Sequence, residues 1–319
     1  MKTALVQAIG IFALVSVSVP AQEIQIQSFA YKKVGALEIQ LDAHRPNDRV
    51  VRPLAVWIHG GALISGGRQG IGPAGKSLLS AGYCVASIDY RLAPETKLPA
   101  IIEDIEDAFR WLRENGRERL HVDPERIAVS GGSAGGYLAL TAGFRVRPRP
   151  SVVIAFWGYG SLVNSWYADP SKHQRHLKDI LTDKEMAAVE AGPAVANSKD
   201  RALNGSTYYQ MTRRLGVWPL KVSGCDPVKE RGRFVPYMAV ENVSGDFPPT
   251  LLIHGTVDTD VPYEESRNMA REFEKHRVPH RLITIEGGEH GLAGGRPADI
   301  AAAYAAVMPF IEKYMKPQL

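Results

Sequence analysis

The segment 127–136 constrains the fold of this chain more than any other part of the sequence. It reads Ile-Ala-Val-Ser-Gly-Gly-Ser-Ala-Gly-Gly: an apolar run, a G-x-S-x-G pattern centred on Ser133, and then residues that suit a helix up to position 142. A serine on such a strand-to-helix turn exposes its hydroxyl, and Gly131 and Gly135 leave room for the strained backbone. The amides at the start of the helix point to where negative charge develops on an attacked substrate. The pattern therefore predicts that Ser133 is a nucleophile.

A serine hydroxyl needs a base that removes its proton, and His290 is the predicted base. It lies in a glycine-containing loop, 286–291, directly after the last predicted strand, which agrees with the chain order serine, acid, histidine. Three other histidines compete for this role. His254 ends a buried strand and is more typical of a core histidine, whereas His276 and His280 are predicted to be at the surface.

The acid that orients the histidine is predicted from the stretch 254–262, which follows the strand 251–253. An acid in this role holds the imidazole in the correct tautomer and stabilises its positive charge. Asp258 comes sooner after the strand and is the predicted acid. Asp260 is interpreted instead as the N-cap of a helix that begins near Pro262, because aspartate caps helices well and proline suits a first turn.

The loop that follows the predicted strand 54–58 is the predicted partner of Ser133 in stabilising an oxyanion. It reads His59-Gly60-Gly61-Ala62, and its glycines let the backbone approach a substrate closely. The predicted donors are the backbone N–H groups of Gly60 and Gly61, together with that of Ala134. We expect His59 to shape the loop by hydrogen bonds rather than to act as a second base.

Short, nearly continuous apolar runs are typical of strands that are buried on both faces of a parallel sheet. They occur at 54–58, 83–88, 127–129, 152–156, 251–253 and 282–285. Alternating residues at 23–27 and 37–41 predict an antiparallel edge instead, and a clear amphipathic helix is predicted at 99–115. Strands that alternate with helices indicate an α/β fold with a mainly parallel central sheet flanked by helices.

Residues 157–250, hereafter the insertion, are longer than a simple crossover between parallel strands, which needs about a dozen residues or more. A polar helix is predicted within it at 172–190. The insertion is rich in aromatic residues: Trp157, Tyr159, Trp166, Tyr167, Tyr208, Tyr209, Trp218, Phe234 and Tyr237. They favour a cap that lines a substrate pocket. The alternative is an accessory subdomain whose aromatic residues fill only its own core.

The N-terminus is predicted to be a secretory signal peptide. Lys2, an apolar run at 8–19 and the sequence Val19-Pro20-Ala21 give its layout, with cleavage after Ala21 and a mature domain at 22–319. We therefore expect an exported protein, in the periplasm or outside the cell; an uncleaved anchor is the alternative. The apolar run of this leader is too short to span a membrane, and no second apolar run reaches that length.

Charge and cysteine content limit the classes of partner. The chain has 38 basic and 34 acidic side chains, interspersed along the sequence, so no basic stripe predicts nucleic-acid binding. Cysteine and histidine do not cluster at ligand spacing, so no metal is expected. Cys84 and Cys225 are predicted to be free thiols, with a disulfide as the alternative. The oligomeric state stays open.

Five sequence pieces together resemble the α/β-hydrolase superfamily and, more narrowly, the hormone-sensitive-lipase-like bacterial esterases. The pieces are residues 59–61, 89–95, 131–136, 255–258 and 290–291, which span nearly the whole predicted mature chain. The resemblance implies an α/β-hydrolase fold and a cofactor-free carboxylesterase for short acyl, aryl or carbohydrate-linked esters. The chain departs from the family at Ala62, where a third glycine is usual, and at Gly132, where aspartate is usual. Its insertion also differs from the N-terminal cap that is common in that family.

The predicted function is hydrolysis of a small-molecule ester by an acyl-enzyme mechanism that uses Ser133, His290 and Asp258. A serine peptidase is one alternative, because the same three groups serve amide hydrolysis and the stretch around Asp258 resembles prolyl-oligopeptidase-like domains. A binding protein on a hydrolase scaffold that has lost its activity is the other, because fold does not fix function. That alternative expects a missing catalytic residue, and none is missing here.

Overall fold

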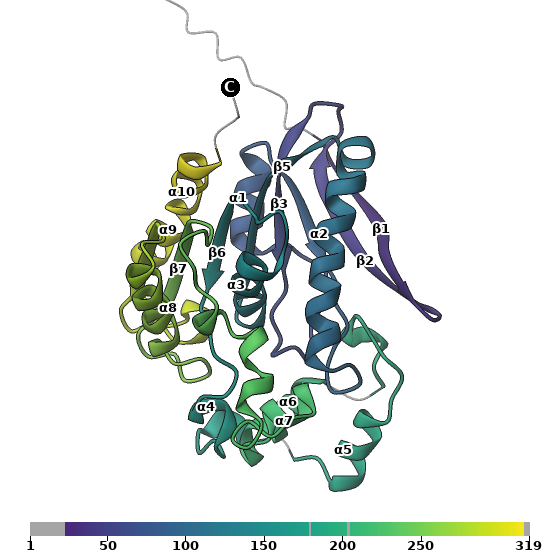
Figure 1. The fold of residues 1–319 in the computed structure, drawn as a ribbon, viewed down its shortest axis with the longest axis vertical. Helices are drawn as coiled ribbons and strands as arrows, with labels where there is room; N and C mark the ends of the chain where they lie inside the picture. The colour runs from purple at the N-terminus through teal and green to yellow at the C-terminus, as the bar shows by residue number, and fades with distance from the viewer. Residues whose placement is uncertain (1–22, 179, 203–204, 316–319) are drawn as a thin grey trace, which may run out of the picture.

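The computed structural model describes residues 23–178, 180–202 and 205–315, and an eight-stranded sheet forms the centre of this part of the chain (Figure 1). The predicted signal peptide lies outside the described residues. The strand order is β1-β2-β4-β3-β5-β6-β7-β8. The strands are β1 (Ile24–Val34), β2 (Leu37–Pro46), β3 (Arg52–Ile58), β4 (Cys84–Ile88), β5 (Val122–Gly132), β6 (Val152–Phe156), β7 (Thr250–Gly255) and β8 (His280–Ile285). In this order, β1 pairs with β2 and β2 pairs with β4 antiparallel, whereas all neighbouring strands from β4 to β8 pair parallel. This arrangement confirms the predicted sheet and its antiparallel edge.

Two apolar layers cover the sheet, one on each face. Buried side chains of α2 (Leu98–Leu120), α3 (Ala134–Arg145) and α8 (Glu264–Lys275) belong to one layer. Those of α1 (Gly72–Ser80), α9 (Pro297–Ala305) and α10 (Val307–Tyr314) belong to the other. This arrangement explains why the central strands are apolar without alternation, since both of their faces are buried.

Helix α2 is longer than its predicted range of 99–115. Its predicted apolar positions, Ile101 and Ile105 among them, are buried against the sheet. The helix continues through Gly116, where an added Cβ would lie 2.7 Å from Cγ2 of Val122, so a larger residue would push β5 away. It ends at Leu120. The next residue, His121, has a positive backbone φ of 50°, and its N–H donates to the carbonyl of Gly116.

The insertion forms four short α-helices at one end of the sheet (Figure 1). They are α4 (Ser165–Ala168), α5 (Asp183–Glu190), α6 (Gly205–Leu215) and α7 (Trp218–Ser223), with short 3-10 helices between them. The single helix predicted at 172–190 is wrong: its first part holds only η1 (Gln174–His176). α5 begins later because Thr182 and Glu185 form a capping box there.

The aromatic residues of the insertion pack mainly on one another. The rings of Tyr167 and Trp218 stack with centroids 3.8 Å apart, and Tyr159 meets Tyr167 edge to face at 5.3 Å. All three side chains are at most 1% exposed. The insertion therefore has an apolar core of its own, which was the alternative left open by the sequence.

Cys84 lies in β4 and Cys225 follows α7, and both are buried free thiols, as predicted. Within the described ranges, no helix is both long and apolar enough to cross a membrane.

Candidate active site

Ser133 lies on a sharp turn between β5 and α3. Its backbone has φ 57° and ψ −123°, a left-handed φ that costs energy for any residue with a side chain. An added Cβ at Gly131 would lie 2.4 Å from the carbonyl oxygen of Gly135, and one at Gly135 would lie 2.0 Å from that of Ile58. Both glycines are therefore required by close backbone contacts. β5 reaches this turn because residues 130–132 pair with neighbouring strands beyond the predicted end of the strand at 129.

The structure brings Ser133, His290 and Asp258 together, although they come from three separate parts of the chain. Nε2 of His290 is 3.1 Å from Oγ of Ser133. Nδ1 of His290 donates to Oδ2 of Asp258 at 2.8 Å. Asp258 follows β7 and His290 follows β8, so the carboxyl ends of neighbouring parallel strands present the acid and the base to the serine.

Both oxygens of the Asp258 carboxylate accept hydrogen bonds. Its Oδ1 accepts hydrogen bonds from the backbone N–H groups of Asp260 at 2.9 Å and Val261 at 2.8 Å. Burial by itself would raise the pKa of Asp258, but the side chains of His254 and His290 donate to it and lower its pKa to about 2. Burial lowers the pKa of His290, yet the hydrogen bond and charge of Asp258 outweigh this and raise it. The two pKa shifts therefore favour an ionised Asp258 beside a protonated imidazole of His290.

The competing histidines lie where the sequence placed them. His254 is fully buried: its Nδ1 accepts from the Ser266 hydroxyl at 2.7 Å and its Nε2 donates to the Val261 carbonyl at 2.9 Å. Its Nε2 also lies 3.2 Å from Oδ2 of Asp258, so this core histidine supports the acid. His276 caps the end of α8 and His280 begins β8.

Asp260 does not cap a helix, so that prediction is wrong. α8 begins at Glu264, and its N-cap, Tyr263, makes no side-chain cap hydrogen bond. The carboxylate of Asp260 is instead buried and accepts hydrogen bonds from Tyr209 at 2.7 Å and from Arg213 at 3.1 Å. Both partners belong to α6 of the insertion. No local sequence pattern predicts these contacts.

The loop 59–72, which runs from the end of β3 to the start of α1, lies directly against the serine turn. An added Cβ at Gly60 would lie 2.7 Å from the Gly132 carbonyl oxygen and 3.3 Å from Cβ of Ser133. Ala134 is the first residue of α3, next to Ser133. Gly61 has a φ of 106° and its carbonyl accepts from the N–H groups of Ile64 and Ser65, so this glycine is required by the turn of the loop itself.

His59 shapes this loop. Its ring stacks on Tyr90 with centroids 4.3 Å apart, and its Nδ1 donates to the carbonyl of Gly60 at 2.8 Å. Burial lowers the pKa of His59 to about 4, which keeps the ring neutral at physiological pH.

A pocket of about 360 Å³ opens beside Ser133. Its lining residues are Trp57, His59, Gly60, Gly67, Gln69, Gly70, Gly72, Gly132, Ser133 and Trp157. The loop 59–72 therefore supplies most of the wall, and Trp157, the first residue of the insertion, is the one aromatic residue of the insertion among these lining residues. The predicted role of the insertion as the lining of the pocket is thus wrong for its other aromatic residues.

The departure from the family pattern at Gly132, where aspartate is usual, is explained by the close contact of this residue with Trp157. An added Cβ at Gly132 would lie 3.2–3.3 Å from three atoms of the Trp157 indole. An aspartate at this position would therefore displace the indole. Glycine at 132 and tryptophan at 157 together define this wall of the pocket.

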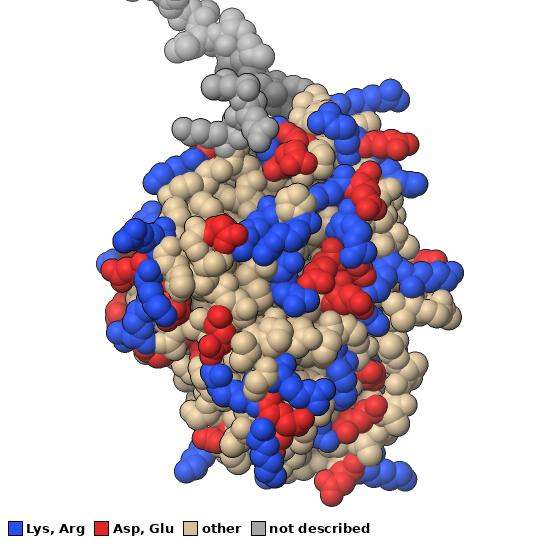
Figure 2. Space-filling view, in the orientation of Figure 1, with Lys and Arg blue, Asp and Glu red and all other residues tan. Residues whose placement is uncertain are grey.

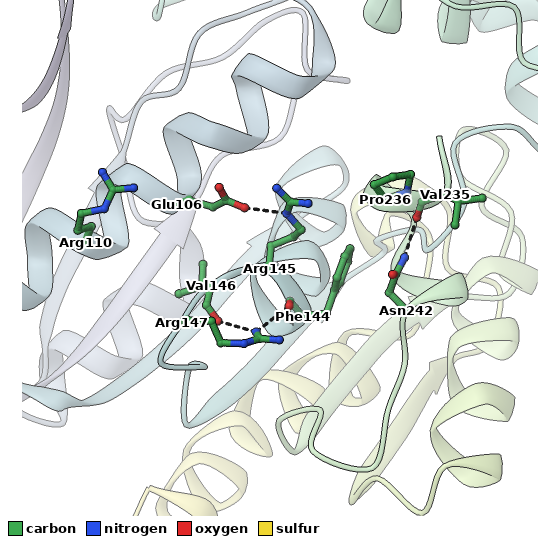
Figure 3. Close-up of a pocket in the computed structure, with 9 residues that line it drawn as sticks. All are labelled: Glu106, Arg110, Phe144, Arg145, Val146, Arg147, Val235, Pro236 and Asn242. Atoms are coloured by element: carbon green, nitrogen blue, oxygen red, sulfur yellow. Dashed lines mark hydrogen bonds and ion pairs between the residues drawn. The ribbon is translucent and has the colours of Figure 1, made fainter. Parts of the chain in front are cut away.

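A larger hollow of about 650 Å³ lies elsewhere, between α2, the end of α3 and the segment around Val235 (Figure 3). Its charged side chains already have partners: Nε of Arg145 donates to Glu106 at 2.7 Å, and Arg147 donates to the carbonyls of Phe144 and Val146. No serine, cysteine or histidine is among its lining residues, so it offers no serine or cysteine nucleophile and no histidine base. Basic and acidic side chains are intermixed over the described part of the face in Figure 2.

Among residues 23–178, 180–202 and 205–315, no group of three or more histidine, cysteine or acidic side chains could hold a metal ion.

Comparison with known proteins supports the same fold. The BD-FAE family model matches residues 37–192, and the model described as the prolyl oligopeptidase family matches residues 206–318. Two curated relatives are the non-reducing polyketide synthases Preu6 and Preu3 of Preussia isomera, 29% and 28% identical over 83% and 82% of this chain. The chain spans only 14% and 12% of their lengths.

Solved structures match over most of their length. A protein of unknown function from Staphylococcus aureus has a TM-score of 0.71 at 22% identity, with 91% of this chain and 99% of that one covered. A butyrate-bound thermophilic esterase from Thermogutta terrifontis has a TM-score of 0.63 at 22% identity, with 94% and 97% covered. A truncated carbohydrate esterase from gut microbiota has a TM-score of 0.64 at 19% identity, with 91% and 96% covered. With its mainly parallel sheet and the serine turn after β5, the chain has the α/β-hydrolase fold.

Proposed function

We propose that this protein is a serine carboxylic-ester hydrolase that works through an acyl-enzyme. The observation that carries the proposal is the unbroken relay from Oγ of Ser133 to Nε2 of His290 at 3.1 Å and from Nδ1 of His290 to Asp258 at 2.8 Å. The serine end of this relay opens into a pocket. A nucleophile, a base and an orienting acid within hydrogen-bond reach of one another are the arrangement that acyl transfer requires.

In the proposed first step, Oγ of Ser133 attacks the ester carbonyl while Nε2 of His290 takes the hydroxyl proton. The ionised Asp258 stabilises the imidazolium that forms. The backbone N–H groups of Gly60, Gly61 and Ala134 are the proposed donors to the oxyanion. His290 then protonates the leaving alcohol, and in the second step it activates a water that releases the acid.

The pocket favours small esters. Its volume of about 360 Å³ is near the lower end of the range of about 300–1,000 Å³ for small-molecule sites. Trp57 and Trp157 give it flat apolar surfaces, and Gln69 gives it a polar group. Short acyl, aryl or carbohydrate-linked esters fit this lining. Two structural neighbours, a butyrate-bound esterase and a carbohydrate esterase, point to the same class of substrate.

Peptide hydrolysis is the second candidate function. The match of residues 206–318 to the prolyl oligopeptidase family favours it, because this range contains both Asp258 and His290. The relay would serve an amide as well as an ester, so the leaving group has to be tested directly.

The decisive experiment compares p-nitrophenyl acetate, butyrate and octanoate with a peptide p-nitroanilide. Wild-type protein should hydrolyse the short esters, and Ser133→Ala should lower kcat by about a million-fold. Ser151→Ala, a matched change at a loop serine whose hydroxyl donates to the carbonyl of Glu125, should keep full activity. Cleavage of the anilide at a comparable rate would favour the peptidase, and silence on every substrate would contradict both.

We also propose that residues 1–21 direct export and are removed after Ala21. N-terminal sequencing of the protein recovered from the periplasm or the medium of an expressing bacterium should begin at Gln22. Recovery of the full chain from the cytoplasm alone would contradict this.

A further inference from the structure

Asp260 places a second carboxylate beside His290, at the ring nitrogen that faces the serine. Oδ2 of Asp260 lies 3.8 Å from Nε2 of His290, whereas Asp258 bonds Nδ1 at 2.8 Å. The backbone N–H of Asp260 donates to Oδ1 of Asp258, so the two acids are fixed to each other. Asp260 is therefore close enough to act on His290 by charge but too distant to bond it.

The other oxygen of Asp260 is fully engaged by the insertion. Oδ1 accepts from the Tyr209 hydroxyl at 2.7 Å, from Nη1 of Arg213 at 3.1 Å and from Nε2 of His176 at 3.1 Å. Arg213 is 3% exposed and His176 is fully buried, so these contacts exclude water. Arg175 adds a cation 3.6 Å from Oδ2. One acid thus receives donors from both η1 and α6.

The charges around this cluster keep Asp260 ionised. Burial would raise its pKa, but the hydrogen bond from His176 and the charges of His290 and Arg213 lower it well below its usual range. Burial also lowers the pKa of His176, which makes this ring a neutral donor. The titratable and charged groups that face His290 or Asp260 are Asp258, His254, Glu289, Arg175, His176, Tyr167, Tyr209 and Arg213.

We infer that Asp260 is a positioning residue through which the insertion controls the base, His290. The insertion holds Oδ1, and Oδ2 therefore stays beside Nε2 without taking its proton. In this position the carboxylate stabilises the imidazolium and leaves Nε2 to Ser133. Without its donors, the carboxylate is free to turn and to accept a hydrogen bond from the protonated Nε2, in competition with Ser133 and the leaving group. The kinetic part of this inference rests on the proposed ester hydrolysis; the effect on the imidazole does not.

The first test follows the titration of the His290 ring by NMR in wild-type protein and in Asp260→Asn. Loss of the negative charge should move the His290 titration to lower pH, by on the order of one pH unit. The acid limb of kcat/KM should move by the same amount. Asp246→Asn, a matched change at an exposed acid that pairs with Arg149, should move neither. An unchanged His290 titration in a folded Asp260→Asn would overturn the inference.

The second test frees Asp260 instead of removing it. Arg213→Gln should lower kcat by about tenfold or more and move the His290 titration to higher pH, because the carboxylate then acts on the imidazolium without its counter-charge. Adding Asp260→Asn to Arg213→Gln should restore most of the lost kcat. A double variant no more active than Arg213→Gln would show that Arg213 acts only through folding and would sink the inference.

Milder variants keep the test open if Arg213→Gln fails to fold. Tyr209→Phe removes one donor and keeps the shape of the ring, and it should move the His290 titration to higher pH by a smaller amount in the same direction. No change in Tyr209→Phe together with no change in Asp260→Asn would contradict the inference. Wild-type protein that hydrolyses no ester, but whose His290 titration responds as stated, would refute the proposed function and leave the inference standing.

Discussion

The loop 59–72 and the insertion, residues 157–250, both border Ser133, but they contribute in opposite ways. The loop provides most of the pocket wall, largely through glycines that bring its backbone against the serine turn. The insertion carries many large aromatic side chains, yet Trp157 is the one that lines the pocket, while Tyr159, Tyr167 and Trp218 are buried in its own core. Aromatic content alone therefore does not identify the region that shapes a site.

The two regions are nevertheless tied together behind the pocket. The Trp218 indole N–H donates to the carbonyl of Ala62 at 3.0 Å, and the N–H of Gly66 donates to the Ser198 hydroxyl at 3.1 Å. Arg201 donates to the carbonyl of Ile64 and pairs with the buried Glu95 at 2.6 Å. The loop thus gives the pocket its shape, and the insertion holds the loop and contacts His290 through Asp260.

Of changes in these two regions, the largest effect on catalysis should come from a methyl group in the loop. Gly60→Ala places a Cβ 2.7 Å from the Gly132 carbonyl oxygen and so moves the loop away from the serine turn. We expect kcat/KM for p-nitrophenyl acetate to fall about 100- to 1,000-fold, the usual effect of losing one oxyanion donor. Gly232→Ala, in the insertion, meets nothing within 4 Å and should leave kcat/KM unchanged. Equal effects of the two changes would erase the contrast between the regions.

The largest effect on stability should come from the insertion core. Trp218→Ala removes a buried ring that stacks on Tyr167 and a hydrogen bond to the loop, and the free energy of unfolding should fall by about 3–5 kcal/mol in urea titrations. Trp111→Ala, on the partly buried surface of α2, should cost less. A Trp218→Ala protein as stable as the wild type would mean that the insertion does not brace the loop.

The pH dependence of the unfolding free energy should reveal the stabilising contribution of the Asp258 carboxylate. The pKa of Asp258 is lowered from 3.8 to about 2 in the folded protein, so its stabilising contribution is complete above its unfolded pKa and is lost as the pH falls through about 2. The size of this contribution is roughly 2 kcal/mol. His290 has the opposite sign: its pKa is raised, so its contribution is lost as the pH rises.

Asp258→Asn should abolish the part of the unfolding free energy that depends on the ionisation of Asp258. The difference in unfolding free energy between wild type and Asp258→Asn should therefore shrink between about pH 5 and about pH 2, as measured by urea unfolding at each pH. A difference that stays constant over this range would show that the carboxylate is not held as the structure has it.

Much of the fold and the grouping of Ser133, Asp258 and His290 could be predicted from the sequence, because both depend on local patterns. The apolar runs identified the strands, and the order of strand ends then placed Asp258 and His290 near Ser133. The capping box of Thr182 and Glu185 was also legible in the sequence, and it would have corrected the helix predicted at 172–190.

The environment of Asp260 and the inward packing of the insertion could not be predicted in this way. Tyr209 and Arg213 reach Asp260 from 51 and 47 residues away along the chain, and only the tertiary fold brings them together. An aromatic residue that lines a pocket and one that fills a core also look the same in sequence. Trp157, which lines the pocket, has a positive backbone φ of 36°, and no sequence pattern encodes that angle.

The smallest predicted effect tests whether the insertion holds the loop or merely touches it. Ser198→Ala removes the hydroxyl that accepts from the N–H of Gly66, and the lost bond should cost about 1 kcal/mol of unfolding free energy. Because Gly66 lies beside His59, the loop should also loosen at the pocket, and KM should rise a few-fold with little change in kcat. Ser77→Ala, at an exposed position of α1, removes a serine hydroxyl that donates to the carbonyl of Pro73 within the same helix, and it should change neither quantity. A loss of stability without a rise in KM would mean that the insertion stabilises the protein without setting the shape of the pocket.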